Sequence, residues 1–132
     1  MQDRFKLRIW DYNKSVMVYF DSPWACKKPY TEGSTFPQYE NSPHYHKISD
    51  FMQCTGLKDN NSKMIFEGDI VKFSSIYGHG VFEIKWSDEL ATFGYEDKDT
   101  DFCELGRLYQ EAAYVEILGN IYENTETLKE AQ

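Results

Sequence analysis

The sequence predicts a mainly β protein, and three observations support this fold class. Aromatic residues make up 17% of the chain, and aromatic side chains favour a pleated, half-buried surface. Short apolar runs recur along the chain, several of them with the two-residue alternation of a strand. After residue 48, turn residues separate about six such runs, a spacing typical of a small barrel or roll.

The N-terminal segment predicts a β-hairpin. Apolar and basic side chains alternate before Trp10, which places them on opposite faces of a strand. The apolar residues are Phe5, Leu7 and Ile9, and the basic residues are Arg4, Lys6 and Arg8. Asp11–Lys14 has turn composition, and Val16–Phe20 has the length of a strand. The basic residues could form a local basic patch, but we favour the solvated outer face of an edge strand.

The four prolines all lie between residues 21 and 47 and follow no period. Because proline lacks a ladder donor, we expect a long connection there rather than strands. The composition changes near Ile48, so the sequence predicts two parts. Residues 1–47 contain the hairpin and the proline-interrupted loop, and residues 48–132 contain the barrel. Such loops often carry recognition residues, which makes residues 21–47 the first candidate for a binding surface.

The second part contains the remaining predicted strands. They are Phe51–Thr55, Met64–Phe66, Ile70–Phe73, Val81–Trp86, Thr92–Tyr95 and Tyr114–Tyr122. Asp59–Ser62 and Gly68–Asp69 are turn signals, and Ser74–Gly80 is expected to be a loop. Gly119 lies inside an apolar run, which predicts a β-bulge or a close backbone approach. A short C-terminal helix is expected at Glu126–Ala131.

Four motifs carry a resemblance to a known family. They are Thr55–Asp59 (TGLKD), Ile65–Val71 (IFEGDIV), Arg4–Asp11 (RFKLRIWD) and Ile117–Asn124 (ILGNIYEN). In their order along the chain these motifs resemble the YopX family, small proteins encoded mainly by phages and prophages. The sequence departs from the family pattern at Ser62, Phe66 and Thr125, where the family usually has Gly, Tyr and Pro.

The resemblance implies an SH3-like barrel in the C-terminal part and a smaller N-terminal part, with no established activity to carry over. The shared motifs are interpreted as structural. Gly68 is expected to supply an unusual backbone conformation, and Asp69 to accept hydrogen bonds in a turn. Glu67 and Asp69 could be a carboxylate pair, but no partner base or metal ligand lies nearby in sequence.

Metal and cofactor sites have little support in the sequence. His44 and His46 have a spacing that metals use, but a third ligand is not identifiable, and His79 is expected to fill a turn. Asp97, Asp99 and Asp101 copy the start of a calcium loop. The copy fails further on, where Phe102 replaces the glycine and Leu108 the final glutamate. We expect no metal and no cofactor.

The charge and the cysteine content limit which partners and which cellular compartment are expected. The chain carries 22 acidic and 14 basic residues and a net charge of −8, which disfavours nucleic acid and anionic membranes. Cys26, Cys54 and Cys103 form no pair motif and are expected to be free thiols in a reducing cytosol. The N-terminus is too charged for a signal peptide, and no apolar run has the length of a membrane span. We therefore expect a cytoplasmic protein.

The acidic loop at residues 96–104 is most simply a solvated loop, although its acids could imitate the charge of DNA. No GxSxG, P-loop or GxGxxG motif is present. We expect no catalytic activity. The predicted function is protein–protein binding or self-association through aromatic residues in excess of core needs. The alternative is a nucleic-acid-binding or nuclease-type SH3-like barrel.

Overall fold

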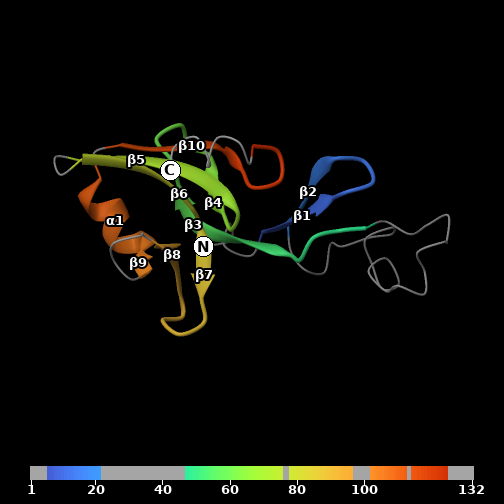
Figure 1. The fold of residues 1–132 in the computed structure, drawn as a ribbon, viewed down its shortest axis with the longest axis horizontal. Helices are drawn as coiled ribbons and strands as arrows, with labels where there is room; N and C mark the ends of the chain where they lie inside the picture. The colour runs from blue at the N-terminus through green and yellow to red at the C-terminus, as the bar shows by residue number, and fades with distance from the viewer. Residues whose placement is uncertain (1–5, 22–46, 76–77, 97–101, 113, 125–132) are drawn as a thin grey trace. The chain divides into compact units, whose positions relative to one another are not determined.

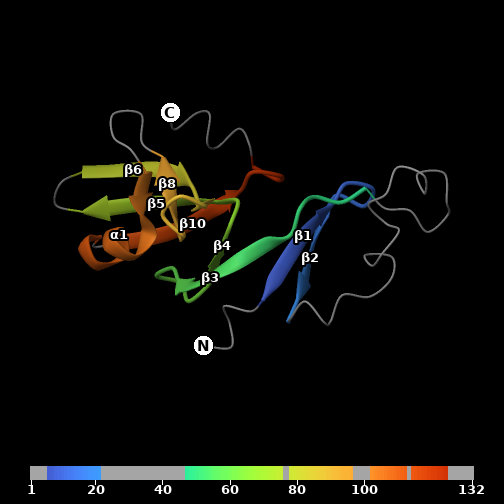
Figure 2. The same ribbon diagram turned by 90° about the horizontal axis from the view of Figure 1, so that it is seen from below.

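The computed structural model describes residues 6–21, 47–75, 78–96, 102–112 and 114–124 (Figures 1 and 2). These residues form short strands and one short helix, which confirms the mainly β class. The chain divides into two compact units, Met1–Cys54 (unit 1) and Thr55–Gln132 (unit 2). The predicted C-terminal helix lies outside the described residues.

Unit 1 contains the predicted hairpin. Strands β1 (Leu7–Asp11) and β2 (Val16–Phe20) pair antiparallel in the register Leu7↔Phe20 to Asp11↔Val16. The turn between them forms because the buried carboxylate of Asp11 accepts the N–H groups of Asn13 and Lys14, at 2.9 and 3.1 Å. Ser15 then adopts a positive φ of 55° before the chain reverses.

The prediction that β1 is an edge strand with a basic outer face is wrong. The third strand, β3 (Met52–Lys58), also pairs with β1, so the strand order is β2-β1-β3. Arg8 is only 3% exposed, and the next two residues of the strand, Ile9 and Trp10, are also buried. Alternation separates two sets of side chains onto opposite faces, but it does not show that either face reaches water, and buried residues lie on both faces of β1. Arg4 lies outside the described residues.

The boundary between the units lies between Cys54 and Thr55, whereas the sequence places it before Ile48. The residues in between belong with the hairpin through long-range backbone contacts. Ile48 forms a bridge with Asp11, and the N–H of Ser49 donates to the carbonyl of Trp10 at 3.0 Å. The hydroxyl of Ser49 also accepts the N–H of Trp10 at 2.9 Å. A change in composition does not reveal contacts of this kind.

Unit 2 contains two three-stranded antiparallel sheets, ordered β10-β5-β6 and β7-β8-β9, and β4 next to β3. Strands β10, β5 and β6 of the first sheet lie side by side in Figures 1 and 2. The elements are β4 (Met64–Phe66), β5 (Asp69–Ser75), β6 (Gly78–Glu83), β7 (Lys85–Ser87), β8 (Thr92–Glu96), β9 (Phe102–Glu104), α1 (Leu105–Glu111) and β10 (Tyr114–Asn120). The register between β10 and β5 shifts between Ile117 and Gly119, which confirms the predicted bulge.

Three sequence-based predictions for the β6–β7 region differ from the structure. Most of the expected loop at residues 74–80 is strand, and His79 lies in β6 opposite Ser74 rather than in a turn. The single strand expected at Val81–Trp86 is divided at Ile84, whose N–H donates to the carbonyl of Asp69 at 2.9 Å. β6 ends at Glu83, and β7 pairs with β8 in the second sheet.

Neither β9 nor α1 was predicted from the sequence. Phe102–Glu104 was assigned to an acidic loop, but it pairs with β8 in the register Gly94↔Glu104 to Glu96↔Phe102. Helix α1 spans seven residues and packs against β8 and β9. Its first residue, Leu105, is buried in the core of unit 2. A helix this short has too little periodicity to be recognised, and it is held by tertiary packing rather than by propensity.

The core of unit 2 joins both of its sheets. The buried residues are Ile65, Val71, Phe73, Ile84, Tyr95, Leu105 and Val115. Within it, the rings of Phe82 and Tyr95 stack with their centroids 4.0 Å apart, and Phe73 lies 5.6 Å from Tyr95. Since Phe73 and Phe82 belong to the first sheet and Tyr95 to the second, this aromatic stack binds the two sheets together.

Alanine substitutions at two glycines of this unit are expected to have opposite effects on the free energy of unfolding. A Cβ added at Gly106 in α1 would meet no atom within 4 Å, whereas one at Gly94 would lie 2.0 Å from the carbonyl oxygen of Cys103. Gly106→Ala is expected to raise the free energy of unfolding by about 0.5 kcal/mol, because alanine restricts the unfolded chain. Gly94→Ala is expected to lower it by about 2 kcal/mol, because β8 and β9 must separate. Urea denaturation of both variants checks this pair, and equal effects would contradict the close approach of β8 and β9.

Candidate functional site

The turn at Asp59–Ser62 is attached to strand β10, far along the chain. The carboxylate of Asp59 accepts the N–H groups of Asn61 and Lys63, both at 2.9 Å, and thereby closes its own turn. Its other oxygen accepts the N–H of Ile117 at 3.1 Å. Asp59 is 5% exposed, so these bonds are shielded from water. One side chain therefore shapes the turn and holds it against β10.

The neighbouring Asn60 completes the attachment. Its N–H donates to the carbonyl of Val115 at 2.9 Å, and its side-chain oxygen accepts the N–H of Val115 at 2.7 Å. Strand β10 pairs with β5 along its other edge. The turn thus occupies the edge of β10 that β5 leaves open, which protects that edge from pairing with another chain.

The second motif also has a structural role. Gly68 has a φ of 84°, as its predicted backbone role requires, and Asp69 is buried. The carboxylate of Asp69 accepts the N–H of Phe66 at 2.8 Å, which confirms the predicted turn bond. The N–H of Gly68 donates to Ile84, and its carbonyl accepts the N–H of Ile121 at 2.9 Å. Because Asp69 is enclosed, it and Glu67 do not form a surface carboxylate pair.

The C-terminal motif closes on itself after the bulge. The side-chain oxygen of Asn120 accepts the N–H groups of Tyr122 and Glu123, at 3.0 and 2.9 Å. A Cβ at Gly119 would lie 2.3 Å from the side-chain oxygen of Asn124, so only glycine fits at the bulge without rearrangement. The motifs that identify this chain in unit 2 are therefore accounted for by turns and by the strands that those turns join.

The other candidates from the sequence are placed as follows. His44, His46, Cys26 and the aspartates at positions 97, 99 and 101 lie outside the described residues. His79 is exposed on β6, Cys54 is buried, and Cys103 is half-buried. Within the described part of the chain, no group of three or more His, Cys, Asp and Glu residues could hold a metal ion.

The β7–β8 hairpin forms a surface that was not predicted from the sequence. Figure 1 shows this hairpin extending away from β5 and β6. Trp86 is 42% and Leu90 48% exposed. In a single strand over Val81–Trp86, Trp86 would share a face with Phe82 and Ile84. The structure instead ends β6 at Glu83 and begins β7 at Lys85, and Trp86 is exposed.

The exposed indole is held in place by two contacts. The ring of Trp86 meets that of Phe93 edge to face, with centroids 4.9 Å apart. Its Nε1–H donates to the carboxylate of Asp88 at 2.9 Å. The turn is closed by Ser87, whose hydroxyl accepts the N–H of Leu90 at 3.1 Å. Trp86 is therefore an exposed aromatic side chain in a defined position, not a freely rotating one.

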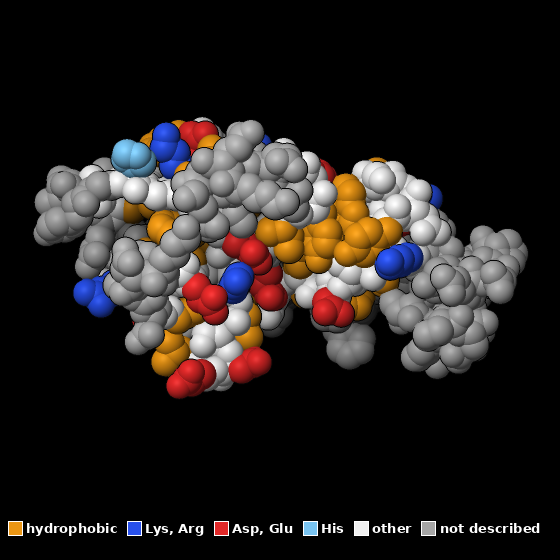
Figure 3. Space-filling model, viewed as in Figure 1, with side chains coloured by type: hydrophobic (Ala, Val, Ile, Leu, Met, Phe, Trp, Pro, Cys, Tyr) orange, Lys and Arg blue, Asp and Glu red, His pale blue; other side chains and the backbone are white. Residues whose placement is uncertain are grey.

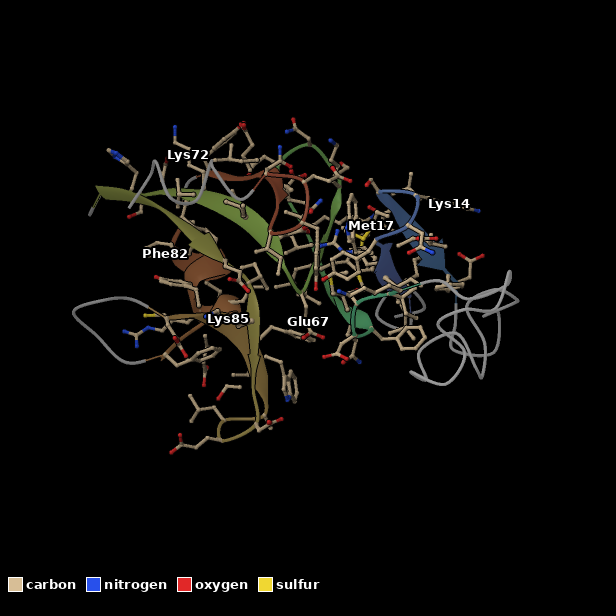
Figure 4. The ribbon with its side chains drawn as sticks, turned by 45° about the vertical axis from the view of Figure 1, so that its right-hand side comes forward. Lys14, Met17, Glu67, Lys72, Phe82 and Lys85 are labelled. Carbon is tan, nitrogen blue, oxygen red and sulfur yellow. The ribbon has the colours of Figure 1, made fainter. Side chains whose placement is uncertain are left out.

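Acidic side chains surround the base of this hairpin (Figure 3). Lys85 Nζ lies 3.7 Å from the carboxylate of Glu96. Partial burial raises the pKa of Glu83, an effect that Lys85 opposes and Glu96 reinforces. Figure 4 labels Lys85 and Glu67, which belong to two backbone segments joined by the 2.8 Å bond from the N–H of Gly68 to the carbonyl of Ile84.

A second exposed aromatic residue of unit 2 lies on β10. Tyr114 donates its hydroxyl hydrogen bond to the carboxylate of Glu116, and this bond raises the pKa of the tyrosine. Tyr114 is exposed but is not part of the β7–β8 hairpin. It provides a matched comparison for any experiment on Trp86.

Comparison with known proteins identifies the family. The chain matches the family described as YopX protein over residues 6–129, nearly its whole length. The chain belongs to the YopX family. No curated protein matches the sequence. This YopX-family chain is similar to the crystal structure of protein EF1440 from Enterococcus faecalis, with 27% sequence identity and a TM-score of 0.54 over 93% of this chain and 96% of that one.

Within the described residues of this YopX-family protein, no helix has the length and apolar character needed to cross a membrane.

Among the polar residues of these turns, Asp59 is expected to be the most sensitive to substitution. Asp59→Ala leaves three N–H groups without their acceptor and should lower the free energy of unfolding by about 3 kcal/mol. Asp59→Asn keeps one acceptor oxygen and should cost less. Urea denaturation followed by tryptophan fluorescence measures both. An alanine variant within about 0.5 kcal/mol of the wild type would contradict this role, since surface substitutions have effects of that size.

Glu83 is expected to make stability fall as the pH rises. A carboxyl whose pKa is raised by folding binds its proton more tightly in the folded chain than in the unfolded chain. The folded state therefore loses stability as the pH rises above 4.5, the ordinary value for this group, through the raised pKa. Glu83→Gln should be more stable than the wild type at neutral pH and equal to it below pH 4.5.

Thermal unfolding across this pH range measures the difference between Glu83→Gln and the wild type. Glu89→Gln, which changes an exposed carboxylate at the hairpin turn, is the control. A Glu83→Gln variant that is destabilised at neutral pH would contradict the prediction.

Proposed function

We propose that this YopX-family protein acts by binding another protein and has no catalytic activity of its own. The observation that carries the proposal is the exposed pair Trp86 and Leu90 on the projecting β7–β8 hairpin. Large exposed apolar side chains are common at protein interfaces, and tryptophan is among the residues that contribute most to binding.

The fixed position of Trp86 supports the same proposal. Phe93 and Asp88 hold its indole before any partner arrives. A side chain that is already ordered loses little conformational entropy on binding. Burial of the indole and of Leu90 then contributes to affinity, with little cost for arranging them.

The proposed partner is a host or phage protein in the cytoplasm, and the proposed role is that of an accessory protein of phage or prophage origin. Membership of the YopX family supports this origin. The net charge of −8 favours a protein partner over the alternative function, a nucleic-acid-binding or nuclease-type protein, because phosphate recognition depends on Lys and Arg.

Self-association is a second candidate, supported by strand β2. Among the described strands, β2 lies at the end of its sheet and pairs with β1. It contains no charged residue between Val16 and Phe20, and Tyr19 is 61% exposed. An apolar strand at the edge of a sheet can pair with the same strand of a second copy.

We also propose that unit 2 is a variant of the SH3-like barrel. The support is the arrangement of two antiparallel sheets around one core, joined where the chain bends at Ile84. This assignment places the β7–β8 hairpin at a loop-bearing rim, where small barrels commonly present their binding residues.

The test compares proteins captured from host cells by the tagged wild type and by a Trp86→Ala, Leu90→Ser double variant. We expect the double variant to lose the captured protein, with at least about a tenfold decrease, because removing one buried tryptophan costs about 2 kcal/mol or more. Tyr114→Ala, which removes an exposed aromatic residue outside the hairpin, should retain it.

Light scattering on the same purified proteins measures self-association. Equal capture by the wild type and the double variant, with all samples monomeric, would overturn the proposal that binding occurs through this hairpin.

A further inference from the structure

The two edges of the first sheet differ in how they are covered. Strand β10 is covered along its outer edge by the turn at Asp59 and Asn60. Strand β6 lies at the other edge, with β5 between it and β10 (Figure 2). Among the described residues, no backbone hydrogen bond joins the outer edge of β6 to another strand or turn. An uncovered edge strand offers its N–H and C=O groups to other chains. Strand β6 is therefore a candidate site for strand pairing.

The alternation of hydrogen bonds shows which residues of β6 offer these groups. The N–H of Ile84 donates to the carbonyl of Asp69 at 2.9 Å, one position beyond Glu83 in the register with β5. Bonded and non-bonded pairs alternate along an antiparallel ladder. Glu83, Val81 and His79 therefore occupy the non-bonded positions, and their N–H and C=O groups point away from β5.

The covered edge of the sheet gives the same alternation independently. Val115 and Ile117 bond the turn with backbone groups that point away from β5. Their partners in β5, Phe73 and Val71, must then direct their own N–H and C=O groups toward β6. The residues of β6 opposite these two are the bonded ones, and the residues between them point outward. Two separate sets of bonds thus place the same three residues on the open edge.

The side chains of the three outward residues share one face of the sheet and are accessible there. His79 is exposed, and Val81 and Glu83 are half-buried. Phe82, which lies between them, points to the other face and stacks on Tyr95 in the core. A strand added at this edge can therefore pair with β6 without opening the core.

A second copy of this chain fits the edge in one register. Two β6 strands that pair antiparallel about a twofold axis at Val81 place His79 of one copy opposite Glu83 of the other. This register bonds all the outward residues in three pairs of two bonds each, whereas any other antiparallel register leaves at least one of them unpaired within β6. An imidazole and a carboxylate directly opposite each other attract, and the symmetry forms this contact twice. Gly80 lies opposite Phe82 and has no side chain to crowd its ring.

We propose that this YopX-family protein forms a symmetric dimer through β6, in which the first sheets of two copies join into one continuous sheet. The edge selects a second copy because its own residues complement one another across the twofold axis. This local complementarity acts against the repulsion expected from a net charge of −8 on each copy. The inference does not depend on binding at the β7–β8 hairpin, and it gives self-association a surface different from β2.

Sedimentation velocity of the full-length chain over a range of concentrations measures the dimer. We expect the wild type to dimerise and Val81→Lys to weaken the dimer about tenfold, because two like charges would then lie opposite each other at the twofold axis. Tyr19→Lys adds the same charge to β2 and should dimerise as the wild type does. Far-UV circular dichroism checks that both variants fold.

Three outcomes of this experiment contradict the inference. They are a wild type that stays monomeric at every concentration, a folded Val81→Lys variant that dimerises normally, and a dimer that is lost in Tyr19→Lys. The Trp86→Ala, Leu90→Ser variant should keep the dimer, and its loss there would place the contact on the hairpin instead. A monomeric wild type leaves the proposed binding at the hairpin standing.

Substitutions at the exposed His79 test the register without touching the core. His79→Lys should tighten the dimer and His79→Glu should loosen it, each about fivefold, because each change acts on both symmetric contacts with Glu83. Within one copy the two residues are four apart along the strand, about 13 Å, which is too far for direct contact. Gln110→Lys and Gln110→Glu make the same changes in net charge on the exposed side of α1 and should leave the dimer unchanged. Equal effects at positions 79 and 110 would refute the pairing of His79 with Glu83.

Discussion

The attachment of the Asp59–Asn60 turn to β10 is the constraint on which unit 2 depends. Asp59 and Asn60 bond backbone groups of Val115 and Ile117, more than fifty residues away in sequence. These bonds fix one edge of β10, and β5 fixes the other. Because β5 also pairs with β6, the position of the whole first sheet follows from this turn. The core residues Val71, Phe73 and Val115 then meet the second sheet.

The β7–β8 hairpin is a consequence of the same frame. The Gly68–Asp69 turn bonds both backbone polar groups of Ile84, the residue between β6 and β7. The chain then leaves the first sheet and forms a second one, in which Trp86 faces outward. The motifs that identify the YopX family thus build the support, whereas the proposed binding residues lie on the element that this support directs outward.

The sequence predicted local structure well wherever the chemistry of one residue fixes the nearby backbone. Asp11, Asp69 and Gly119 were assigned to a turn, a turn and a bulge, and the structure has them there. It failed where a distant strand decides the environment. Arg8 was placed on a solvated face of an edge strand, and it is buried in a central strand. The candidate site followed the same pattern, since neither the exposure of Trp86 nor the partial burial of Glu83 has a signal in the sequence.

The sequence by itself determined the mainly β class, the family and the positions of the tight turns. These features depend on chemistry within a few residues, such as a carboxylate that accepts nearby N–H groups or a glycine at positive φ. The tertiary structure alone decided which strands are central, where the second sheet begins and which aromatic residues remain exposed. Those outcomes depend on pairing between residues that are far apart in sequence, and alternation along one strand is the same whichever face a distant partner covers.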